Sequence, residues 1–535
     1  MFMKQDEIHF TSTRDKKLRI GFWQSIAQGI APDGGLLVPT KLPKLPVELL
    51  KSGKFWRNSK VSDLSNTIHR LFIPRSEISD KDLAGMMNKA HNFDLPLEQF
   101  DAETFILRID RGPTASFKDV AARSLAKLLE KYCEKHETVI NIVVATSGDT
   151  GVAIADAFGG SKRITVTILY PDGGVSEIQE KQMIDVHNRY QNIQSIPVKG
   201  NFDVCQDIAK LLQAAREFSS ADEKTVKIFI NEIENKLGTK ISDKDARELT
   251  EIVSTLHLSS ANSINIWRLI PQMTQNFVAY GKLIKEKRIK VGDEIIFAIP
   301  SGNLGHFMAG LYAKAIGLPI KKFIIATNAN NILANVIGSG NIKHHKFSKT
   351  SSPSMDILDP SNLERLLHFA SENNGKPVMI DFVGMKNDIK KADDTESTTT
   401  LLKYGVTQKM LDYLKNLAWA EDVETDEEVY SMMERVSRRN NITMEPHGVT
   451  ALIASIRARM KQAINKKDIV VVMETAHPDK FPDALREANI QVAAKHKHVK
   501  LTLLAKTPIS KMKKPVALPI NLLSIAKVIE SISYK

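Results

Sequence analysis

The chain has 535 residues, of which 42% are hydrophobic and 25% charged, and its 74 Lys and Arg outnumber its 62 Asp and Glu by 12. This composition is that of an ordinary globular protein and excludes a collagen-like, coiled-coil or mainly disordered chain. The length suffices for several domains of roughly 150 residues with sizeable cores. Two cysteines, Cys133 and Cys205, are too few for a disulfide framework or a multi-thiolate metal site, which indicates a reducing compartment.

The predicted elements begin with a turn at Ala31–Pro39, where Pro and Gly residues precede a short strand. From about Phe105 onward, apolar runs alternate with helical patterns. The apolar runs are those of strands covered on both faces of a parallel sheet, and they span 139–145, 164–169, 294–299, 321–327 and 468–474. Helical patterns lie between them at 120–131, 152–158 and 305–316. This alternation predicts an α/β fold with parallel sheets, in which 217–255 is a charged helical insertion and 386–400 is inserted or mobile.

The N-terminus and the basic residues bear on location and partners. The first residues lack the apolar core of a signal peptide, and no apolar run approaches the roughly 18 residues that span a membrane. We therefore expect a cytoplasmic protein with no membrane partner. The densest basic run, 495–514, contains no Phe, Trp or Tyr to stack on bases. We interpret it as a solvated tail and expect no nucleic-acid partner, although a positive field attracts anionic substrates.

Lys118 is the first candidate for chemistry, because it lies at the start of an Ala- and Leu-rich helical pattern. An ammonium group near a helix N-terminus faces the positive end of the helix dipole, which lowers its pKa. A lysine with a lowered pKa can lose its proton and condense with a carbonyl group. A solvated lysine in a first helical turn is the alternative.

Two glycine-containing loops, Ser147–Gly151 and Ser301–Gly305, each follow a predicted buried strand and open a helix. Such loops can turn backbone N–H groups toward an anion, and neither has the Walker or dinucleotide glycine spacing. A tight strand-to-helix turn is the alternative for each. Thr475 and His477 follow another strand, and His447 can begin a helix. No metal-binding motif or nucleophile elbow is present, which argues against metal and serine-hydrolase chemistry.

A candidate Schiff-base lysine together with phosphate-binding loops is the set of groups that pyridoxal 5′-phosphate requires, since its aldehyde needs an amine and its phosphate needs N–H donors. The chain also resembles threonine synthases of the longer bacterial and fungal kind. Nine sequence motifs carry this resemblance in family order, namely FTSTR with APDGGLLVP, RGPTASFKD, ATSGDTG, GNFDVCQ, SSANSINIWRLIPQ, PSGNLGHFMAGLYAKAIGLP, ATNANN, EPHGVTA and ETAHPDKF.

The resemblance implies a pyridoxal-phosphate enzyme of fold type II, similar to the tryptophan synthase β chain, with parallel sheets flanked by helices. It implies a lyase that converts O-phospho-L-homoserine and water to L-threonine and phosphate, as a monomer or homodimer. It further implies an N-terminal domain over 1–100 and a large cofactor-binding domain over 101–145 and 275–535. A small domain over 146–274 would carry the helical insertion.

The resemblance also implies roles for individual residues. Lys118 matches the Schiff-base lysine, and Thr475 matches the threonine that hydrogen-bonds the pyridine nitrogen and leaves it unprotonated. The loop that cradles the cofactor phosphate is matched by Gly302, Asn303, Leu304, Gly305 and His306, where His306 replaces an acid and can add a donor. Loops that face the substrate are matched by Ser147, Asp149, Thr150, Asn262, Ser263 and Arg268.

The chain departs from the family pattern at four further places: Leu304, Pro271, Glu445 and the long segment 217–255. These departures leave open two other functions. One is a related phospho-lyase that eliminates phosphate and releases a 2-keto acid. The other is a non-catalytic binding protein that keeps the fold.

Overall fold

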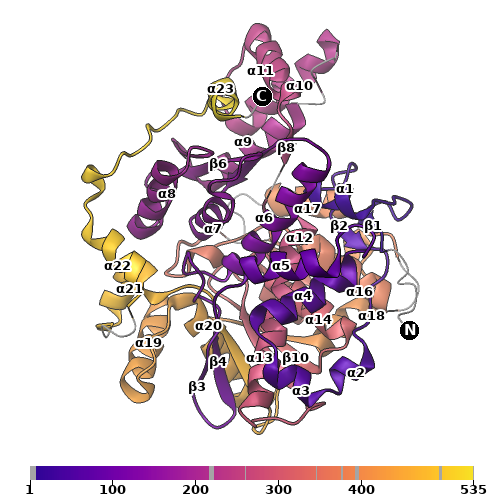
Figure 1. The fold of residues 1–535 in the computed structure, drawn as a ribbon, viewed down its shortest axis with the longest axis vertical. Coiled ribbons are helices and arrows are strands. Elements are labelled where there is room, and N and C mark those ends of the chain that lie inside the picture. The colour runs from indigo at the N-terminus through magenta and orange to yellow at the C-terminus, as the bar shows by residue number, and fades with distance from the viewer. Residues whose placement is uncertain are drawn as a thin grey trace. The chain divides into compact units, whose positions relative to one another are not determined.

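A computed structural model describes residues 8–215, 218, 222–259, 261–344, 346–374, 378–391, 397–492 and 497–533. It divides into two compact units, which are described separately (Figure 1). The first unit comprises residues 1–25, 30–121 and 266–497, and the second comprises 26–29, 122–265 and 498–535. The domain boundaries expected from the family resemblance remain a prediction.

A six-stranded sheet forms the centre of the first unit, in the order β13-β10-β9-β14-β4-β3. All neighbouring strands run parallel except β3, which pairs antiparallel with β4 at one edge. The strands are β3 (Leu97–Gln99), β4 (Thr104–Arg108), β9 (Ile295–Pro300), β10 (Ile320–Thr327), β13 (Ala418–Asp422) and β14 (Val470–Glu474). Every residue of β14 is buried, which confirms that the apolar run at 468–474 forms a strand covered on both faces, and the same holds for β4, which was not among the predicted runs.

Helices α14 (Gly305–Ile316) and α20 (Pro446–Met460) cover opposite faces of this sheet. Ala298 and Ile324 join the core cluster formed with α20. Successive side chains of a strand point to opposite faces. Phe323, which directly precedes Ile324, therefore faces the other side, where its ring contacts Phe307 of α14 with 5.3 Å between ring centroids. The sheet is therefore enclosed between two layers of helices.

The remaining elements of the first unit surround this core. Strands β1 (Phe10–Ser12) and β2 (Leu37–Pro39) pair antiparallel, so the expected turn and short strand are confirmed. A second antiparallel pair is β11 (Asn341–His344) with β12 (Ser397–Thr400). The other helices are α1 (Phe22–Ala27), α2 (Val47–Leu50), α3 (Gly53–Asn58), α4 (Val61–Phe72), α5 (Asp80–Ala90), α12 (Ile266–Leu269), α13 (Met273–Lys285), α15 (Ile332–Ser339), α16 (Leu363–Asn373), α17 (Phe382–Lys391), α18 (Gln408–Leu417), α19 (Asp426–Asn440) and α21 (Pro482–Glu487). In the described part of this unit, short 3₁₀ helices accompany them at η2 (Ile270–Gln272), η3 (Pro353–Met355), η4 (Leu401–Tyr404) and η5 (Pro478–Lys480).

The second unit is built on a parallel four-stranded sheet in the order β7-β6-β5-β8. Its strands are β5 (Ile140–Ala145), β6 (Ile164–Pro171), β7 (Ile193–Val198) and β8 (Leu258–Ser259). Helix α6 (Lys118–Lys135) begins in the first unit and continues here. The other helices are α7 (Asp149–Phe158), α8 (Glu177–Arg189), α9 (Phe202–Ala215), α10 (Glu223–Leu237), α11 (Asp243–Thr255), α22 (Val499–Lys506) and α23 (Leu522–Ile532).

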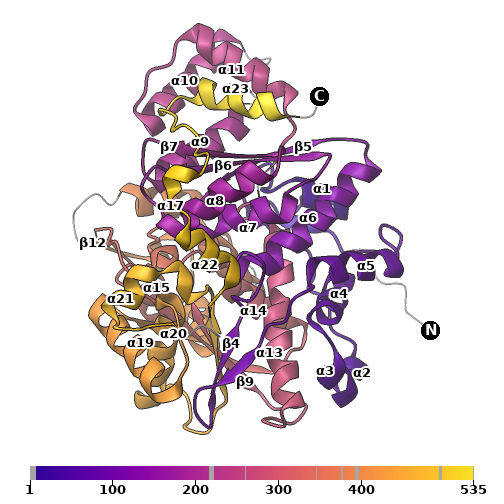
Figure 2. The same ribbon diagram turned by 60° about the vertical axis from the view of Figure 1, so that its left-hand side comes forward.

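The expected helical insertion is present as α10 and α11, which pack against α9 and α23 (Figures 1 and 2). Its first part, residues 217 and 219–221, lies outside the described residues. In the segment 386–400, expected to be inserted or mobile, residues 386–391 belong to α17 and 397–400 form β12, which pairs with β11, while 392–396 lie outside the described residues. Whether this segment is an insertion stays a prediction.

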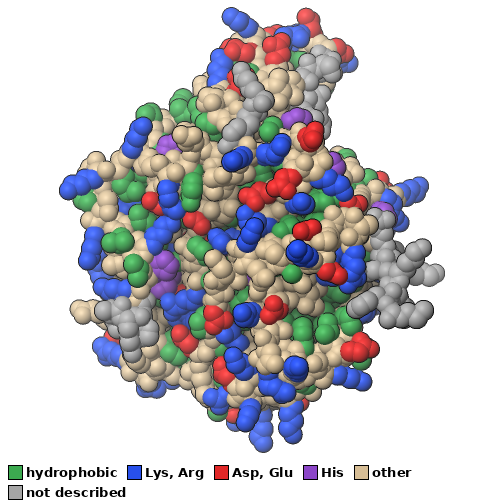
Figure 3. Space-filling view, in the orientation of Figure 1, with side chains coloured by type: hydrophobic (Ala, Val, Ile, Leu, Met, Phe, Trp, Pro, Cys, Tyr) green, Lys and Arg blue, Asp and Glu red, His purple; other side chains and the backbone are tan. Residues whose placement is uncertain are grey.

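The interpretation of 495–514 as a solvated tail was wrong in part, because α22 packs against α8, although Lys506, Lys511 and Lys513 are exposed. Leu501 in α22 is buried, and Lys514 pairs with Glu180 at 2.8 Å. These contacts fold the segment onto the second unit, while residues 495 and 496 lie outside the described part. On the face drawn in Figure 3, Lys and Arg side chains are interspersed with acidic ones. Within the described residues, no helix is both long and apolar enough to cross a membrane.

Candidate active site

Lys118 and Thr475, which are far apart in the sequence, lie on two backbone segments that hydrogen-bond to each other. The N–H of Phe117 donates to the carbonyl of Thr475 at 2.8 Å, and the N–H of His477 donates to the carbonyl of Ala115 at 3.0 Å. Ala115 is buried with a φ of 58°, a left-handed conformation that costs energy for a residue other than glycine. These bonds hold Lys118 at the start of α6, directly beside the loop that follows β14.

The aromatic ring of Phe117 connects Lys118 to the glycine-containing loop of the first unit. The Lys118 ammonium lies 4.6 Å from the centroid of this ring, within the range of a cation–π interaction. The ring also stacks on His306, with 5.8 Å between centroids and 16° between planes. Lys118 and His306 are therefore positioned against the same side chain.

The glycine-containing loop 301–304 joins β9 to α14. Leu304 occupies the N-cap with a φ of 59°, and no side chain caps the first turn of the helix. The first N–H groups of a helix have no partner within it, and they lie at the positive end of its dipole. This end of α14 can therefore bind an anion such as a phosphate group.

Segment 353–362 fixes the shape of this loop. The Asn303 side-chain oxygen accepts from the N–H and the hydroxyl of Ser361, each at 3.1 Å. The side-chain amide of Asn362 donates to the Asn303 carbonyl at 2.9 Å. A Cβ on Gly302 would lie 2.4 Å from the carbonyl oxygen of Ser354, so only glycine fits there.

Buried polar atoms with no protein partner lie beside this loop. His306 is 5% exposed, and among the described residues neither of its ring nitrogens has a hydrogen-bond partner. The side-chain amide of Gln272 lies 3.9 Å from the place that a Cβ on Gly305 would take, and its side-chain oxygen likewise lacks a partner in the described part of the chain. Leaving such groups unsatisfied costs about 1–3 kcal/mol each. Together with the uncapped helix end, they fit a bound polar group at this place.

Burial lowers the pKa of His306 to about 3, so its ring is neutral at pH 7. A neutral imidazole offers one N–H donor and one acceptor. His306 can therefore donate a hydrogen bond to a phosphate oxygen without adding a positive charge.

The Thr475 side chain belongs to a buried network at the start of α20. Its hydroxyl donates to Glu445 Oε1 at 3.1 Å, and Glu445 is the N-cap of this helix. Glu445 Oε2 lies 2.5 Å from His447 Nδ1. The N–H of Ser354 donates to His447 Nε2 at 3.1 Å, so Nε2 is the acceptor and Nδ1 carries the proton. Because the Ser354 carbonyl also contacts Gly302, the network extends from Thr475 to the glycine-containing loop.

A buried acid, Glu474, precedes Thr475. Burial, reinforced by Glu445 and Asp110 and opposed by Arg108, raises its pKa well above the ordinary value for a glutamate. One of its oxygens accepts from the Glu445 N–H at 2.8 Å. Burial therefore favours the neutral form of the Glu474 carboxyl group, which limits the negative charge beside Glu445.

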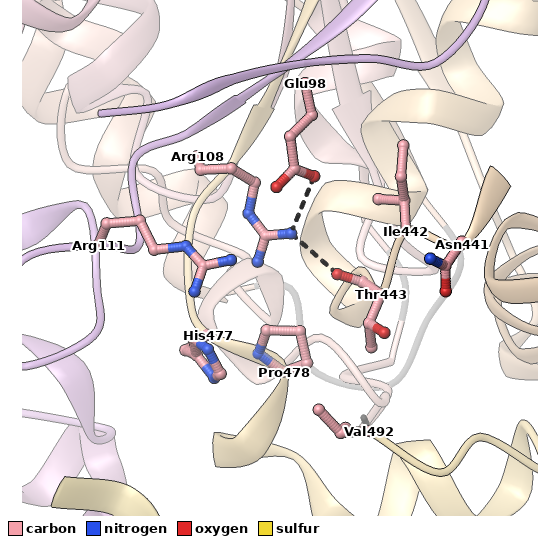
Figure 4. Close-up of a pocket in the computed structure, with 9 residues that line it drawn as sticks. All are labelled: Glu98, Arg108, Arg111, Asn441, Ile442, Thr443, His477, Pro478 and Val492. Atoms are coloured by element: carbon pink, nitrogen blue, oxygen red, sulfur yellow. Dashed lines mark hydrogen bonds and ion pairs between the residues drawn. The ribbon is translucent and has the colours of Figure 1, made fainter. Parts of the chain in front are cut away.

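Arg108 neutralises the remaining buried acid behind these loops. It pairs with Asp110 at 2.8 Å, and this ion pair lowers the Asp110 pKa although burial opposes the shift. Arg108 also donates to the Thr443 carbonyl at 3.0 Å and lies 3.5 Å from Glu98 (Figure 4). Arg108 and Arg111 both line a cavity of about 70 Å³, in which Arg111 lies next to His477 (Figure 4).

Five of the residues expected to face the substrate belong to the second unit, and Arg268 belongs to the first. Ser147 and Thr150 are half-buried at the start of α7. Asp149 is buried and accepts from the Gln179 side-chain amide at 2.9 Å. Asn262 and Ser263 are half-buried in the loop before α12. Burial lowers the Arg268 pKa to about 10, so this side chain remains a cation at pH 7.

Several residues around these groups were missed from the sequence. Glu445 carries a readable signal, since an acid before Pro446 is typical of a helix N-cap. No signal in the local sequence marks Ser354, Ser361 or Gln272. They reach the glycine-containing loop only because the fold brings distant segments together.

Comparisons with known proteins place this arrangement in context. A family model described as "Threonine synthase N terminus" matches residues 9–91. The chain is 32% identical to threonine synthase of Saccharomyces cerevisiae over 90% of its length and 88% of the yeast protein. It is 30% identical to threonine synthase of Pseudomonas aeruginosa, over 90% of this chain and 91% of that protein. A crystal structure of PLP-bound threonine synthase from Brucella melitensis superposes with a TM-score of 0.78 and 29% identity, covering 99% of this chain and 100% of the other.

Proposed function

The chain belongs to the threonine synthase family, and from that premise we propose that it converts O-phospho-L-homoserine and water to L-threonine and phosphate. It is a lyase of fold type II that depends on pyridoxal phosphate, as its likeness to a PLP-bound threonine synthase supports. The identity of the substrate is part of this proposal. A location in the cytoplasm and an assembly as a monomer or homodimer are also proposed.

The residues of the first unit fit the cofactor. Lys118 would hold its aldehyde carbon as a Schiff base, and Thr475 would face its ring nitrogen. The uncapped start of α14, with Gly302 to Gly305, would receive its phosphate, and His306 would donate a further hydrogen bond. The observation that carries this proposal is the connected backbone and hydrogen-bond network that joins these three groups.

When bound, pyridoxal phosphate supplies an aldehyde that condenses with amines and a ring that accepts electrons from the substrate. Lys118, once released from the cofactor, would remove and return protons at the substrate's Cα and Cβ. The residues that would each face the substrate are Ser147, Thr150, Asn262, Ser263 and Arg268. Positively polarised N–H groups at the start of α7 would stabilise phosphate as it leaves. Asp149, which accepts from Gln179, would fix the shape of that helix start.

The test is an absorbance spectrum of the purified full chain, followed by addition of O-phosphohomoserine with threonine and inorganic phosphate measured together. A visible chromophore and equal amounts of the two products are expected. Phosphate accompanied by 2-oxobutanoate, without threonine, would instead indicate the related phospho-lyase. A chromophore with no product would leave a cofactor-binding protein of this fold.

A further inference from the structure

Arg365 and Asn362 connect the N-terminal strand pair to the glycine-containing loop 301–304. Both side chains are fully buried at the start of α16. Arg365 donates through Nη2 to the carbonyl of Leu37 in β2 at 2.9 Å and through Nη1 to the side-chain oxygen of Asn362. The side-chain amide of Asn362 donates in turn to the Asn303 carbonyl at 2.9 Å. A chain of hydrogen bonds therefore runs from β2 to the loop.

A second buried side chain of α16, Glu364, fixes the N-terminal segment to the same helix turn. Its carboxylate accepts from the Thr13 hydroxyl and from Arg14 Nη2, the latter at 2.9 Å. The strand pair is therefore bound to the first turn of α16 by two neighbouring residues. This holds the Leu37 carbonyl in place for Arg365.

Arg365 determines which way the Asn362 amide is turned. A guanidinium group has donors and no acceptor, so the Asn362 atom that faces it must be the oxygen. The nitrogen of the same amide then faces the Asn303 carbonyl and can only donate to it. The carbonyl and the following N–H of a trans peptide point to opposite sides of the chain. Holding the Asn303 carbonyl therefore directs the N–H of Leu304 away from Asn362.

Leu304 needs such support from its surroundings. Its φ of 59° is a left-handed conformation that costs energy for leucine and persists where neighbouring contacts hold it. Leu304 is also the N-cap of α14, and the N–H groups at a helix start can bind an anion. The direction of the Leu304 N–H therefore bears on anion binding at this helix start.

We propose that Asn362 and Arg365 are positioning residues that direct the Leu304 N–H toward the cofactor phosphate, and that the N-terminal strand pair anchors them through Leu37. This inference rests on the proposed function, because it takes the loop and the start of α14 to receive that phosphate. The two side chains would act through the loop without touching the cofactor. They would set the affinity for the phosphate group and leave the chemistry at Lys118 unchanged.

The test compares the binding of pyridoxal 5′-phosphate with that of pyridoxal, which has the aldehyde but no phosphate. The full chain, freed of cofactor, is titrated with each, and the visible absorbance of the Schiff base gives the two Kd values. Asn362→Leu removes the donor to Asn303, and Arg365→Met removes the donors to Asn362. Each variant is expected to raise the Kd for pyridoxal phosphate by about 10-fold or more, the usual effect of losing a hydrogen bond to a charged group. The Kd for pyridoxal is expected to stay near its wild-type value.

Two control variants in α16 separate positioning from general stability. Asn373→Leu changes an exposed asparagine whose amide donates to the Phe369 carbonyl at 2.8 Å. Leu366→Ala removes a fully buried apolar side chain and lowers stability without removing a hydrogen bond. In both variants the ratio of the two Kd values is expected to match that of the wild type.

The ratio of the two Kd values decides the outcome. An unchanged ratio in Asn362→Leu and Arg365→Met, whether both constants rise or neither does, would overturn the inference. The same change of ratio in Leu366→Ala would overturn it too, because the effect would then follow from lost stability. In either case, turnover of O-phosphohomoserine by the wild type would show that the proposed function stands. A wild type that gives no chromophore with either ligand would overturn the proposed function and this inference with it.

Discussion

The imidazole of His306 stacks on the ring of Phe117, and Phe117 directly precedes Lys118. The stack joins the first turn of α14 to the residue just before α6, and these two helix starts carry the proposed phosphate and aldehyde contacts. His306 therefore has two properties that can be tested separately: its packing against Phe117 and its neutral charge.

The buried neutral state of His306 predicts a dependence of stability on pH. Its folded pKa of about 3 lies below the ordinary value of 6.5, so the unfolded chain binds the proton more readily. This contribution to stability is fully present above pH 6.5 and is lost as the pH falls from 6.5 toward 3. At pH 5 the loss from this group is roughly 2 kcal/mol, from 1.5 pH units at 1.36 kcal/mol each.

The measurement is the thermal midpoint of wild type and His306→Leu at pH 7.5 and pH 5. The variant is expected to lose less stability between the two conditions than the wild type. His136→Leu, at an exposed position, is the control and should follow the wild type. Equal losses in wild type and His306→Leu would contradict the prediction.

Lys118→Ala is expected to abolish the visible absorbance that a Schiff base to the protein gives. It should also lower turnover by at least about 10²–10⁴, the usual contribution of a general base. Lys127→Ala is the matched control, because Lys127 lies in the same helix and pairs only with Glu130 at 2.7 Å. Its spectrum and activity are expected to match wild type, and normal turnover in Lys118→Ala would contradict the assignment.

The strands and the main helices of the site could be predicted from local sequence. The helical pattern at 305–316 has the bounds of α14, and the run 164–169 lies within β6. These segments were readable because a strand covered on both faces must be apolar throughout, and glycines mark where it turns into a helix. The contact between Thr475 and Glu445 was not readable, because the two residues lie 30 positions apart in the sequence.

Residues 495–514 were misread in part for a different reason. Lysines are frequent in them, but a few apolar side chains decide where the segment packs. Leu501 and Leu504 are buried in the second unit despite the basic residues around them. The charge of such a segment indicates which of its side chains are exposed. Whether its apolar side chains are buried depends on the surface against which the segment packs.

Gly302 and Gly305 are predicted to differ sharply when each is replaced by alanine. The new Cβ at position 302 would lie 2.4 Å from a backbone oxygen, whereas at 305 the nearest atom is 3.8 Å away. Gly302→Ala is therefore expected to cost about 1–3 kcal/mol through forced backbone shifts. Gly305→Ala should leave stability unchanged or slightly raised, because alanine favours a helix. Denaturant unfolding of both variants without added cofactor checks the contrast, and equal destabilisation would contradict it.

Arg108 is predicted to stabilise the loops behind the site mainly by neutralising Asp110. Both side chains are buried and joined at 2.8 Å, so Arg108→Met leaves a buried carboxylate with its principal cation removed. The expected loss of stability is about 3–5 kcal/mol. Arg108→Met combined with Asp110→Asn should recover part of it, because position 110 then carries no buried charge. Arg438→Met is the control, since Arg438 is exposed and pairs with Glu434 at 2.7 Å, and losing such a surface ion pair should change stability little. Unfolding midpoints of the four proteins at pH 7 test this, and a double variant no more stable than Arg108→Met would show that lost packing, not the Asp110 charge, explains the effect.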